Sequence, residues 1–384
     1  MQKDTGFSAR IYNLVKGLAA TGNDVKLILP KYRSTHEVVE GVNVHGLKGS
    51  SPRAMLETLK TLANVERPTS LYFYDFLFIL RVCRFIRRSD VVQIEQQSSG
   101  GFLIPLIKKV LKRPVIVDCH DVFQALRVRH TRLLRRLLEI FLEKLAYNNA
   151  DLLLTVSDEE RRYLISAGFK KRNIEVIPNG VDTEFFSKSK KQSWKKTSEE
   201  YGLQGSRIVV FVGNLDYLPN REAVRILSSV IAPIVLDEVK GVKFLVVGKN
   251  RGKLELPGLV FTGFVKDVSD VLNISDIAVA PLFQGSGTRL KILEYFSCGL
   301  PVVSTSVGAQ GLPIESGVNI FIEDDLRKFA LRIIELLKDK NLSTAVGKAA
   351  RNLATSSFDW TQIVQRLEMA LNRLSYKNSC TYTS

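Results

Sequence analysis

The chain has 384 residues, a length that suits two α/β domains better than one ordinary core. Hydrophobic residues make up 45% and charged residues 24%, with no internal repeat or low-complexity stretch, which excludes a disordered or fibrous protein. The formal net charge of +16 is large enough to recruit polyanions or anionic lipid surfaces.

Neither a membrane-spanning segment nor a targeting signal is predicted. No uncharged apolar run reaches the length of a transmembrane helix, and the opening residues MQKDTGFSAR lack the apolar core of a signal peptide. The four cysteines and four histidines are scattered without disulfide or metal-ligand spacing, so no metal site is expected. We therefore expect a cytoplasmic protein.

In the first half, short β-branched runs alternate with longer segments of helical period. This is the pattern of a parallel sheet covered by helices on both faces. Helices are expected at residues 9–20 and 158–167. The predicted strands are residues 24–29, 91–94, 115–117, 152–156 and 174–177.

A basic amphipathic helix is predicted between Arg127 and Arg136. Its arginines, which also include Arg129, Arg132 and Arg135, lie among leucines. Two interpretations stay open. The segment contacts an anionic membrane, peripherally at its inner face, or its leucines pack on the sheet while the basic face is solvated.

Residues 178–196, PNGVDTEFFSKSKKQSWKK, are rich in turn and charged residues and predict an interdomain linker. A second α/β series follows, with strands at 207–212, 243–247, 260–264, 277–280 and 301–304. Helices follow residue 324, the last starting near Asp359 and Trp360. The predicted fold is therefore two doubly wound, Rossmann-like domains facing a cleft. Their expected bounds are 1–182 and 183–358, followed by a C-terminal helix and tail, 359–384.

The segment most informative about chemistry is residues 281–305, PLFQGSGTRLKILEYFSCGLPVVST. A glycine-rich turn before a helix lets backbone N–H groups approach an anion, and the helix dipole adds partial positive charge there. We predict a diphosphate ligand, with Arg289 and Lys291 donating charged hydrogen bonds and Glu294 one turn further meeting ribose hydroxyls. A plain glycine turn with solvated cations fits the residues about equally well.

A series of motifs surrounds this segment and covers nearly the whole chain. They are TGFSARIYNLVKGLAATGNDVKLI at 5–28, VDCHDVF at 117–123, ADLLLTVSDEERRYL at 150–164, IPNGVD at 177–182, VFVGNLDYLPN at 210–220, FLVVGKN at 244–250 and FTGFVKDV at 261–268. Together with GSGTRLKILE, the series resembles glycosyltransferase family 4, the group 1 glycosyltransferases of the GT-B fold.

The resemblance implies a retaining, metal-independent hexosyltransferase whose C-terminal helix crosses back to the first domain. It would move a sugar from a nucleotide-sugar donor to a glycan or lipid-linked acceptor, in surface polysaccharide or glycoconjugate synthesis. The acceptor would be held by the first domain and the donor by the second. The implied donor-binding residues are Gly6, Gly213, Asn214, Gly248, Val265, Gly285, Ser286, Gly287, Thr288 and Glu294. The implied catalytic residues are His120, Arg289 and Lys291, with Glu95 and Asp121 as acceptor-binding candidates at strand ends.

Three positions depart from the family pattern. Ser286 stands where the first of two glutamates is expected, and Asn214 and Asn220 stand where the family has an Arg and a Lys. Arg289 and Lys291 are our candidates to replace that lost charge. The chain also begins only a few residues before Gly6, where the family has a first strand. Two explanations are open: the start of the gene is placed too late, so that this strand is encoded upstream, or the strand is missing from the sheet.

Alternatives from other classes remain. A GT-B-type sugar-nucleotide epimerase or hydrolase would share the nucleotide site, and a non-catalytic sugar-nucleotide-binding homologue would fit Ser286 and the short start. Nucleic acid is not an expected partner despite the basic charge, because no RNA-recognition signature or basic run with interleaved aromatics is present.

Overall fold

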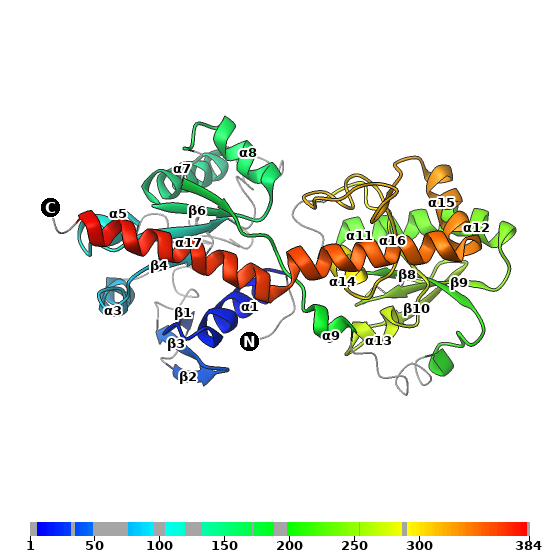
Figure 1. The fold of residues 1–384 in the computed structure, drawn as a ribbon, viewed down its shortest axis with the longest axis horizontal. Helices are drawn as coiled ribbons and strands as arrows, with labels where there is room; N and C mark the ends of the chain where they lie inside the picture. The colour runs from blue at the N-terminus through cyan, green and yellow to red at the C-terminus, as the bar shows by residue number, and fades with distance from the viewer. Residues whose placement is uncertain are drawn as a thin grey trace. The chain divides into compact units, whose positions relative to one another are not determined.

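A computed structural model describes residues 6–31, 35–48, 76–95, 104–119, 133–170, 173–187, 198–252, 254–285 and 290–381. The chain divides into two compact units, one formed by Met1–Pro178 with Ile363–Ser384 and the other by Asn179–Gln362. Each unit contains parallel strands interspersed with helices, as Figure 1 shows. The C-terminal helix α17 (Trp360–Thr381) leaves the second unit and joins the first, as the sequence predicted.

The first unit has two sheets in its described part. One has the order β1-β3-β2, and the other has the order β4-β5-β6-β7 with every pair parallel. The strands are β1 (Lys26–Lys31), β2 (Thr35–Val39), β3 (Val42–Lys48), β4 (Val92–Glu95), β5 (Val115–Cys119), β6 (Leu152–Thr155) and β7 (Ile174–Val176). The helices are α1 (Gly6–Ala20), α3 (Phe76–Ile86), α5 (Ile104–Lys109), α7 (Leu133–Asn149) and α8 (Asp158–Ser166).

The antiparallel hairpin of β2 and β3 was not predicted from the sequence. Its outer strand β2 is almost fully exposed, so it lacks the alternation of apolar and polar residues that marks a half-buried strand. The turn uses Glu40 and Gly41, both with positive φ. Glutamate is an unusual residue for this two-residue turn geometry, so the usual Asn-Gly signal was missing.

Helix α17 packs on α1 within the first unit (Figure 1). A Cβ atom on Gly17 would lie 2.2 Å from a methyl group of Val364, so the two helices approach as closely as a glycine allows. Asn23, just after α1, donates a 3.0 Å hydrogen bond to Glu368. The C-terminal helix is therefore an integral part of the first unit.

The second unit has one parallel sheet of order β10-β9-β8-β11-β12-β13. The strands are β8 (Arg207–Val212), β9 (Val242–Val247), β10 (Leu259–Gly263), β11 (Ile277–Ala280), β12 (Val302–Ser304) and β13 (Phe321–Ile322). The helices are α9 (Thr183–Ser187), α11 (Leu218–Ile226), α12 (Ala232–Glu238), α13 (Val268–Leu272), α14 (Leu290–Ser297), α15 (Leu326–Lys338) and α16 (Lys340–Leu353).

Strand β8 shows how both faces of this sheet are covered. Val209 and Phe211 belong to a buried cluster that includes residues of α11, α12 and α15, whereas Ile208 and Val210 belong to a second cluster with residues of α14. Successive side chains of a strand point to opposite faces, so a run of apolar residues is expected when both faces are buried. The doubly wound architecture predicted from the sequence is confirmed.

Three helical features were not predicted. Helix α9 lies inside the stretch 178–196 that was predicted to be a linker. Two π-helical segments, Leu227–Ile231 between α11 and α12 and Ala354–Phe358 after α16, interrupt the regular α-helical spacing. A π-helical segment has hydrogen bonds between residues five apart, and over a few residues this change does not alter the pattern of apolar residues enough to be recognised.

Candidate functional site

The chain order in the second unit marks one place on the sheet as a candidate ligand site. From β8 the chain proceeds to β9 on one side, and after β10 it returns to β11 on the other side of β8. In open parallel sheets, ligands bind outside the carboxyl ends of the strands at such a switch point, because the connections diverge there and leave a crevice. The segments following β8, β9 and β11 are therefore where a bound ligand is expected.

The backbone is packed closely where β8 and β9 end. Gly213 and Gly248 directly follow these strands, and a Cβ atom on Gly248 would lie 2.0 Å from the carbonyl oxygen of Gly213. Gly248 also has φ +144°, which side-chain-bearing residues rarely adopt. The Gly213 amide donates to Val247 at 2.8 Å, and the Gly248 amide donates to Gly263 at 2.9 Å. Both predicted donor-binding glycines are thus held at the carboxyl edge.

Lys291 crosses the carboxyl end of β8. It belongs to α14, which packs on one face of the sheet, yet its ammonium lies 4.3 Å from the ring centroid of Phe211, whose side chain points to the other face. The ammonium also donates a 2.9 Å hydrogen bond to Oδ1 of Asn220, in the first turn of α11. A positive charge is thereby placed at the switch point.

Tyr295 fixes helix α14 against β8. The amide of Val212, the last residue of β8, donates a 2.8 Å hydrogen bond to the Tyr295 hydroxyl, and the Tyr295 side chain is fully buried. Lys291 and Tyr295 are four residues apart and share a helix face. The hydrogen bond therefore helps to fix the position of Lys291 relative to the end of β8.

Glu294, one turn into α14, is in an environment that disfavours its charge. Burial raises the pKa of the Glu294 carboxyl group above its ordinary value, and the neighbouring Lys291 lowers it by a smaller amount. A hydrogen bond donated by a ligand hydroxyl would stabilise the charged form of this buried carboxylate. The environment is consistent with the predicted ribose contact.

The remaining predicted donor residues are divided between described and undescribed parts of the chain. Gly285 has φ +119°, a conformation that favours glycine, and Val265 lies partly buried just after β10. Asn214 caps the turn after β8 by accepting a 3.0 Å hydrogen bond from the Asp216 amide. Gly6 begins α1 in the first unit. Four residues lie outside the described part: Ser286, Gly287, Thr288 and Arg289.

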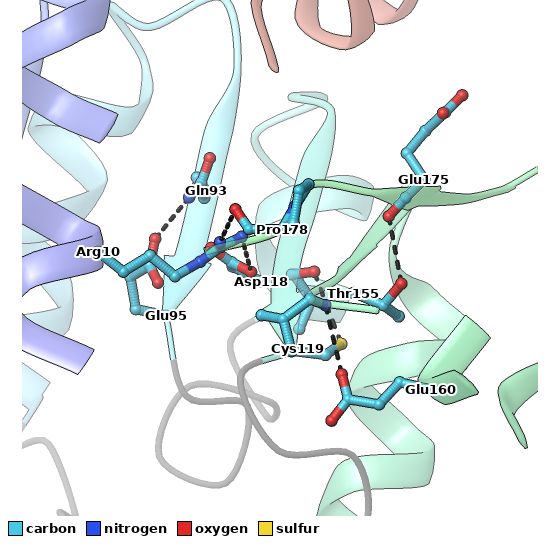
Figure 2. Close-up of polar contacts among 11 residues, drawn as sticks. Arg10, Gln93, Glu95, Asp118, Cys119, Thr155, Glu160, Glu175 and Pro178 are labelled. Atoms are coloured by element: carbon cyan, nitrogen blue, oxygen red, sulfur yellow. Dashed lines mark hydrogen bonds and ion pairs between the residues drawn. The ribbon is translucent and has the colours of Figure 1, made fainter. Parts of the chain in front are cut away.

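In the first unit, Figure 2 shows polar side chains at the carboxyl ends of β4 and β5. Glu95 accepts a 2.5 Å hydrogen bond from Gln93 and lies opposite Asp118 in the register of the two strands. His120 and Asp121, which directly follow β5, lie outside the described residues. Glu95 is therefore the one acceptor-binding candidate whose position is seen.

Arg10 of α1 lies beside this edge. Its guanidinium makes two hydrogen bonds to the Asp118 carboxylate, at 2.9 and 3.0 Å, and a third, at 2.9 Å, to the carbonyl oxygen of Pro178 (Figure 2). Arg10 is 1% exposed and Asp118 is fully buried. One side chain thus ties together α1, the end of β5 and Pro178, the last residue of the first unit before the chain enters the second.

Sequence reasoning missed four residues that build these two edges: Arg10, Asp118, Asn220 and Tyr295. Asn220 was noted as a departure from the family pattern, but its partner is 71 residues away in the chain. Arg10 reaches Asp118 over 108 residues. An arginine on the apolar face of the predicted helix 9–20 was the one available signal, since a buried arginine needs a carboxylate or carbonyl partner.

The described residues include neither a membrane-spanning helix nor a cluster of metal ligands. None of their helices combines the length and apolarity that a membrane crossing requires. Within the same residues, no three His, Cys, Asp or Glu side chains come together as a metal site would require.

Sequence comparison gives matches in both units. Residues 5–185 match the family described as Glycosyltransferase Family 4, and residues 206–339 match the one described as Glycosyl transferases group 1. The chitobiosyldiphosphodolichol beta-mannosyltransferase of Candida albicans is 24% identical over 368 residues, which cover 85% of this chain and 78% of the relative. The UDP-Gal:alpha-D-GlcNAc-diphosphoundecaprenol alpha-1,3-galactosyltransferase of Escherichia coli is 22% identical over 299 residues, or 73% and 74% of the two chains.

Solved structures show the same fold. Anabaena HepE in complex with UDP has a TM-score of 0.72 at 16% identity and covers 97% of this chain and 98% of its own. WaaG, a glycosyltransferase involved in lipopolysaccharide biosynthesis, has a TM-score of 0.65 at 15% identity, with coverage of 94% and 95%. The predicted GT-B fold with two Rossmann-like domains is confirmed.

Proposed function

Because the chain belongs to the group 1 glycosyltransferases of family 4, we propose that it transfers a hexose from a nucleotide-sugar donor to a glycan or lipid-linked acceptor. The product would enter surface polysaccharide or glycoconjugate synthesis. The observation that supports this proposal most is the ammonium of Lys291 at the switch point of the second unit, above closely packed backbone at Gly213 and Gly248.

In this proposal the second unit binds the donor through its diphosphate and ribose. Lys291 and Arg289 donate charged hydrogen bonds to the diphosphate, and backbone amides of the loop formed by Gly285, Ser286, Gly287 and Thr288 add to them. Glu294 accepts hydrogen bonds from the ribose hydroxyls. Negative charge grows on the diphosphate as the glycosidic bond breaks, so these donors stabilise the transition state more than the bound donor.

The first unit supplies the acceptor side. His120 directly follows β5, and we assign it to the reacting region beside the donor sugar, with Glu95 and Asp121 binding acceptor hydroxyls. We further propose that the sugar is transferred with retention of configuration and that no metal ion is needed. The E. coli relative acts on a lipid-linked diphosphate, which supports an acceptor of that class here.

The donor site is tested by kinetics, since its residues have different roles. Lys291→Ala and Arg289→Ala should each lower kcat about 10- to 100-fold, because a lost charged hydrogen bond costs about 1.5–3 kcal/mol in the transition state. Glu294→Gln should mainly raise the donor KM, because ribose is bound in ground and transition state alike. Steady-state rates with a panel of sugar nucleotides measure both parameters, and wild-type turnover in both cation variants would contradict the phosphate assignment.

Two further measurements complete this test. The anomeric configuration of the product, read by NMR, decides retention, which needs its own test because the relatives include both a β-mannosyl and an α-1,3-galactosyl transferase. Unchanged turnover in EDTA is the expected result for a metal-independent enzyme. Release of free or epimerised sugar without transfer would instead support the epimerase or hydrolase alternative, and donor binding without turnover would support a binding homologue.

A cytoplasmic location, peripheral at the inner face of the membrane, is part of the proposal. The arginine-rich segment from Arg127 to Arg136 extends into α7, which begins at Leu133, while residues 120–132 lie outside the described part. Neutralising Arg127, Arg129 and Arg132 should weaken flotation with anionic liposomes at low salt, because each arginine near such a surface contributes about 1 kcal/mol. Neutral liposomes are the control, and unchanged flotation would support the solvated-face interpretation.

A further inference from the structure

The contact between Lys291 and Asn220 is more specific than a surface hydrogen bond. Asn220 is 8% exposed, and both ends of its amide are engaged. Its Oδ1 accepts from the Lys291 ammonium at 2.9 Å, while its Nδ2 donates to the carbonyl oxygen of Asn214 at 2.9 Å. Rotating the amide by half a turn would place its NH₂ group against the ammonium and its oxygen against a carbonyl. The orientation is therefore fixed.

The surrounding backbone is shaped to hold this asparagine. A Cβ atom on Gly213 would lie 2.8 Å from the Asn220 amide, so Asn220 occupies the space that a side chain at 213 would need. Asn214, whose carbonyl orients the amide, precedes a turn that is tied to the segment following β9, because the Leu215 amide donates to the Lys249 carbonyl oxygen at 2.8 Å. The hydrogen bond to Lys291 thus starts from a rigid support.

A flexible lysine gains from such a support. A lysine side chain carries about 2 kcal/mol of rotamer entropy, which is lost when the side chain is held in one place. The Phe211 ring on one side and the Asn220 oxygen on the other restrict the ammonium before any ligand arrives. Neither of these two groups is anionic, since one is a ring and the other an amide, so they restrict the ammonium without cancelling its charge.

We propose that Asn220 is a positioning residue that holds the Lys291 ammonium over the carboxyl end of β8, where it binds the diphosphate of the donor. This inference rests on the proposed function and adds to it the residue that orients the cation. A carboxylate at position 220 would hold the lysine equally well but would cancel its charge. An amide orients the ammonium without that loss.

The short distance between the two residues allows a test by exchange. Their polar ends are 2.9 Å apart, so we expect a lysine at position 220 to carry its ammonium to the region that Lys291 reaches from α14. The double variant Asn220→Lys with Lys291→Asn should therefore restore a function that Lys291→Asn alone has lost. A purely structural asparagine would not permit this exchange.

The experiment measures the binding of nucleoside diphosphates to the full chain by calorimetry, using whichever of UDP, GDP and ADP the wild-type protein binds most tightly. Lys291→Asn should raise Kd about 30-fold and Asn220→Ala about 10-fold, since a charged hydrogen bond contributes about 1.5–3 kcal/mol. The exchanged double variant should recover most of the affinity lost in Lys291→Asn. Thermal unfolding confirms that each variant is folded.

The matched control is Asn250→Ala. Asn250 follows β9 and also uses both ends of its amide, donating to the Leu254 carbonyl and accepting from the Leu254 amide at 2.8 Å each, without contacting Lys291. The Asn250→Ala variant shows the effect of removing a turn asparagine that does not contact Lys291, and its Kd should stay within about 2-fold of wild type.

The outcomes separate this inference from the proposed function. If Asn220→Ala binds no worse than Asn250→Ala, or if the exchanged variant recovers nothing while Lys291→Asn still weakens binding, Asn220 is not a positioning residue and the donor site stands. If Lys291→Asn binds like wild type, or if the wild type binds none of the three nucleotides, the diphosphate assignment itself is wrong and the inference is overturned with it.

Discussion

Replacing Gly248 by alanine should destabilise the second unit by about 2–5 kcal/mol, through backbone strain and overpacking together. Gly248 has φ +144°, and the new methyl group would lie 2.0 Å from the Gly213 carbonyl oxygen. The neighbour that would have to move is the backbone of Gly213, which directly follows β8, so no side chain can rotate away to relieve the contact. The alternative is to separate the strand ends, which would break the hydrogen bonds of Gly213 and Gly248.

Urea unfolding followed by circular dichroism measures this loss, with Gly252→Ala as the matched control. Gly252 lies four residues further in the same connection, does not have a left-handed φ, and has no atom within 4 Å of an added Cβ. Its alanine variant should unfold within about 0.5 kcal/mol of wild type. Equal midpoints for the two variants would show that the close approach of β8 and β9 is wrong.

The sequence predicted the parts of the fold that depend on burial. Strands β5, β6 and β11 are buried at every residue and β8 at its four central residues, so a short apolar run dominates each of them. The hairpin strand β2 was missed because its residues are exposed, and α9 was missed because five residues are too few to show a helical period. Burial leaves a trace in composition, whereas exposed or very short elements do not.

The candidate site was predictable to the extent that it is local in sequence. The glycine loop before α14 and the spacing of Lys291 and Glu294 are visible within ten residues of chain, and the structure places both side chains on that helix. The partners of these residues were not predictable. Asn220, Phe211 and Val212 meet α14 only because β8 and β11 are neighbours in the sheet, and that pairing is a property of the fold.

Breaking a buried ion pair in the first unit should cause the second large loss of folding stability. Arg10 donates two hydrogen bonds to the Asp118 carboxylate, with side-chain exposures of 1% and 0%, and a third to the Pro178 carbonyl oxygen. Two charges removed from water repay their desolvation only when each is satisfied, as here. Removing either partner leaves the other charge buried and uncompensated, which is worse for the folded state than removing both.

Arg10→Met should therefore lower the free energy of unfolding by about 3–5 kcal/mol, and Asp118→Leu should cost a similar amount. The double variant should lose clearly less than the sum of the two, because no unpaired charge remains and the two apolar side chains fill similar volume. The exposed pair of Lys338 and Glu238, 3.4 Å apart and more than half exposed on both sides, is the control, and Lys338→Met should cost less than about 1 kcal/mol. Guanidinium unfolding of all four variants gives the coupling energy directly. Additive losses for Arg10 and Asp118, or a loss in Arg10→Met no larger than in Lys338→Met, would mean that the charges are hydrated and that α1 is not held to β5 by this pair.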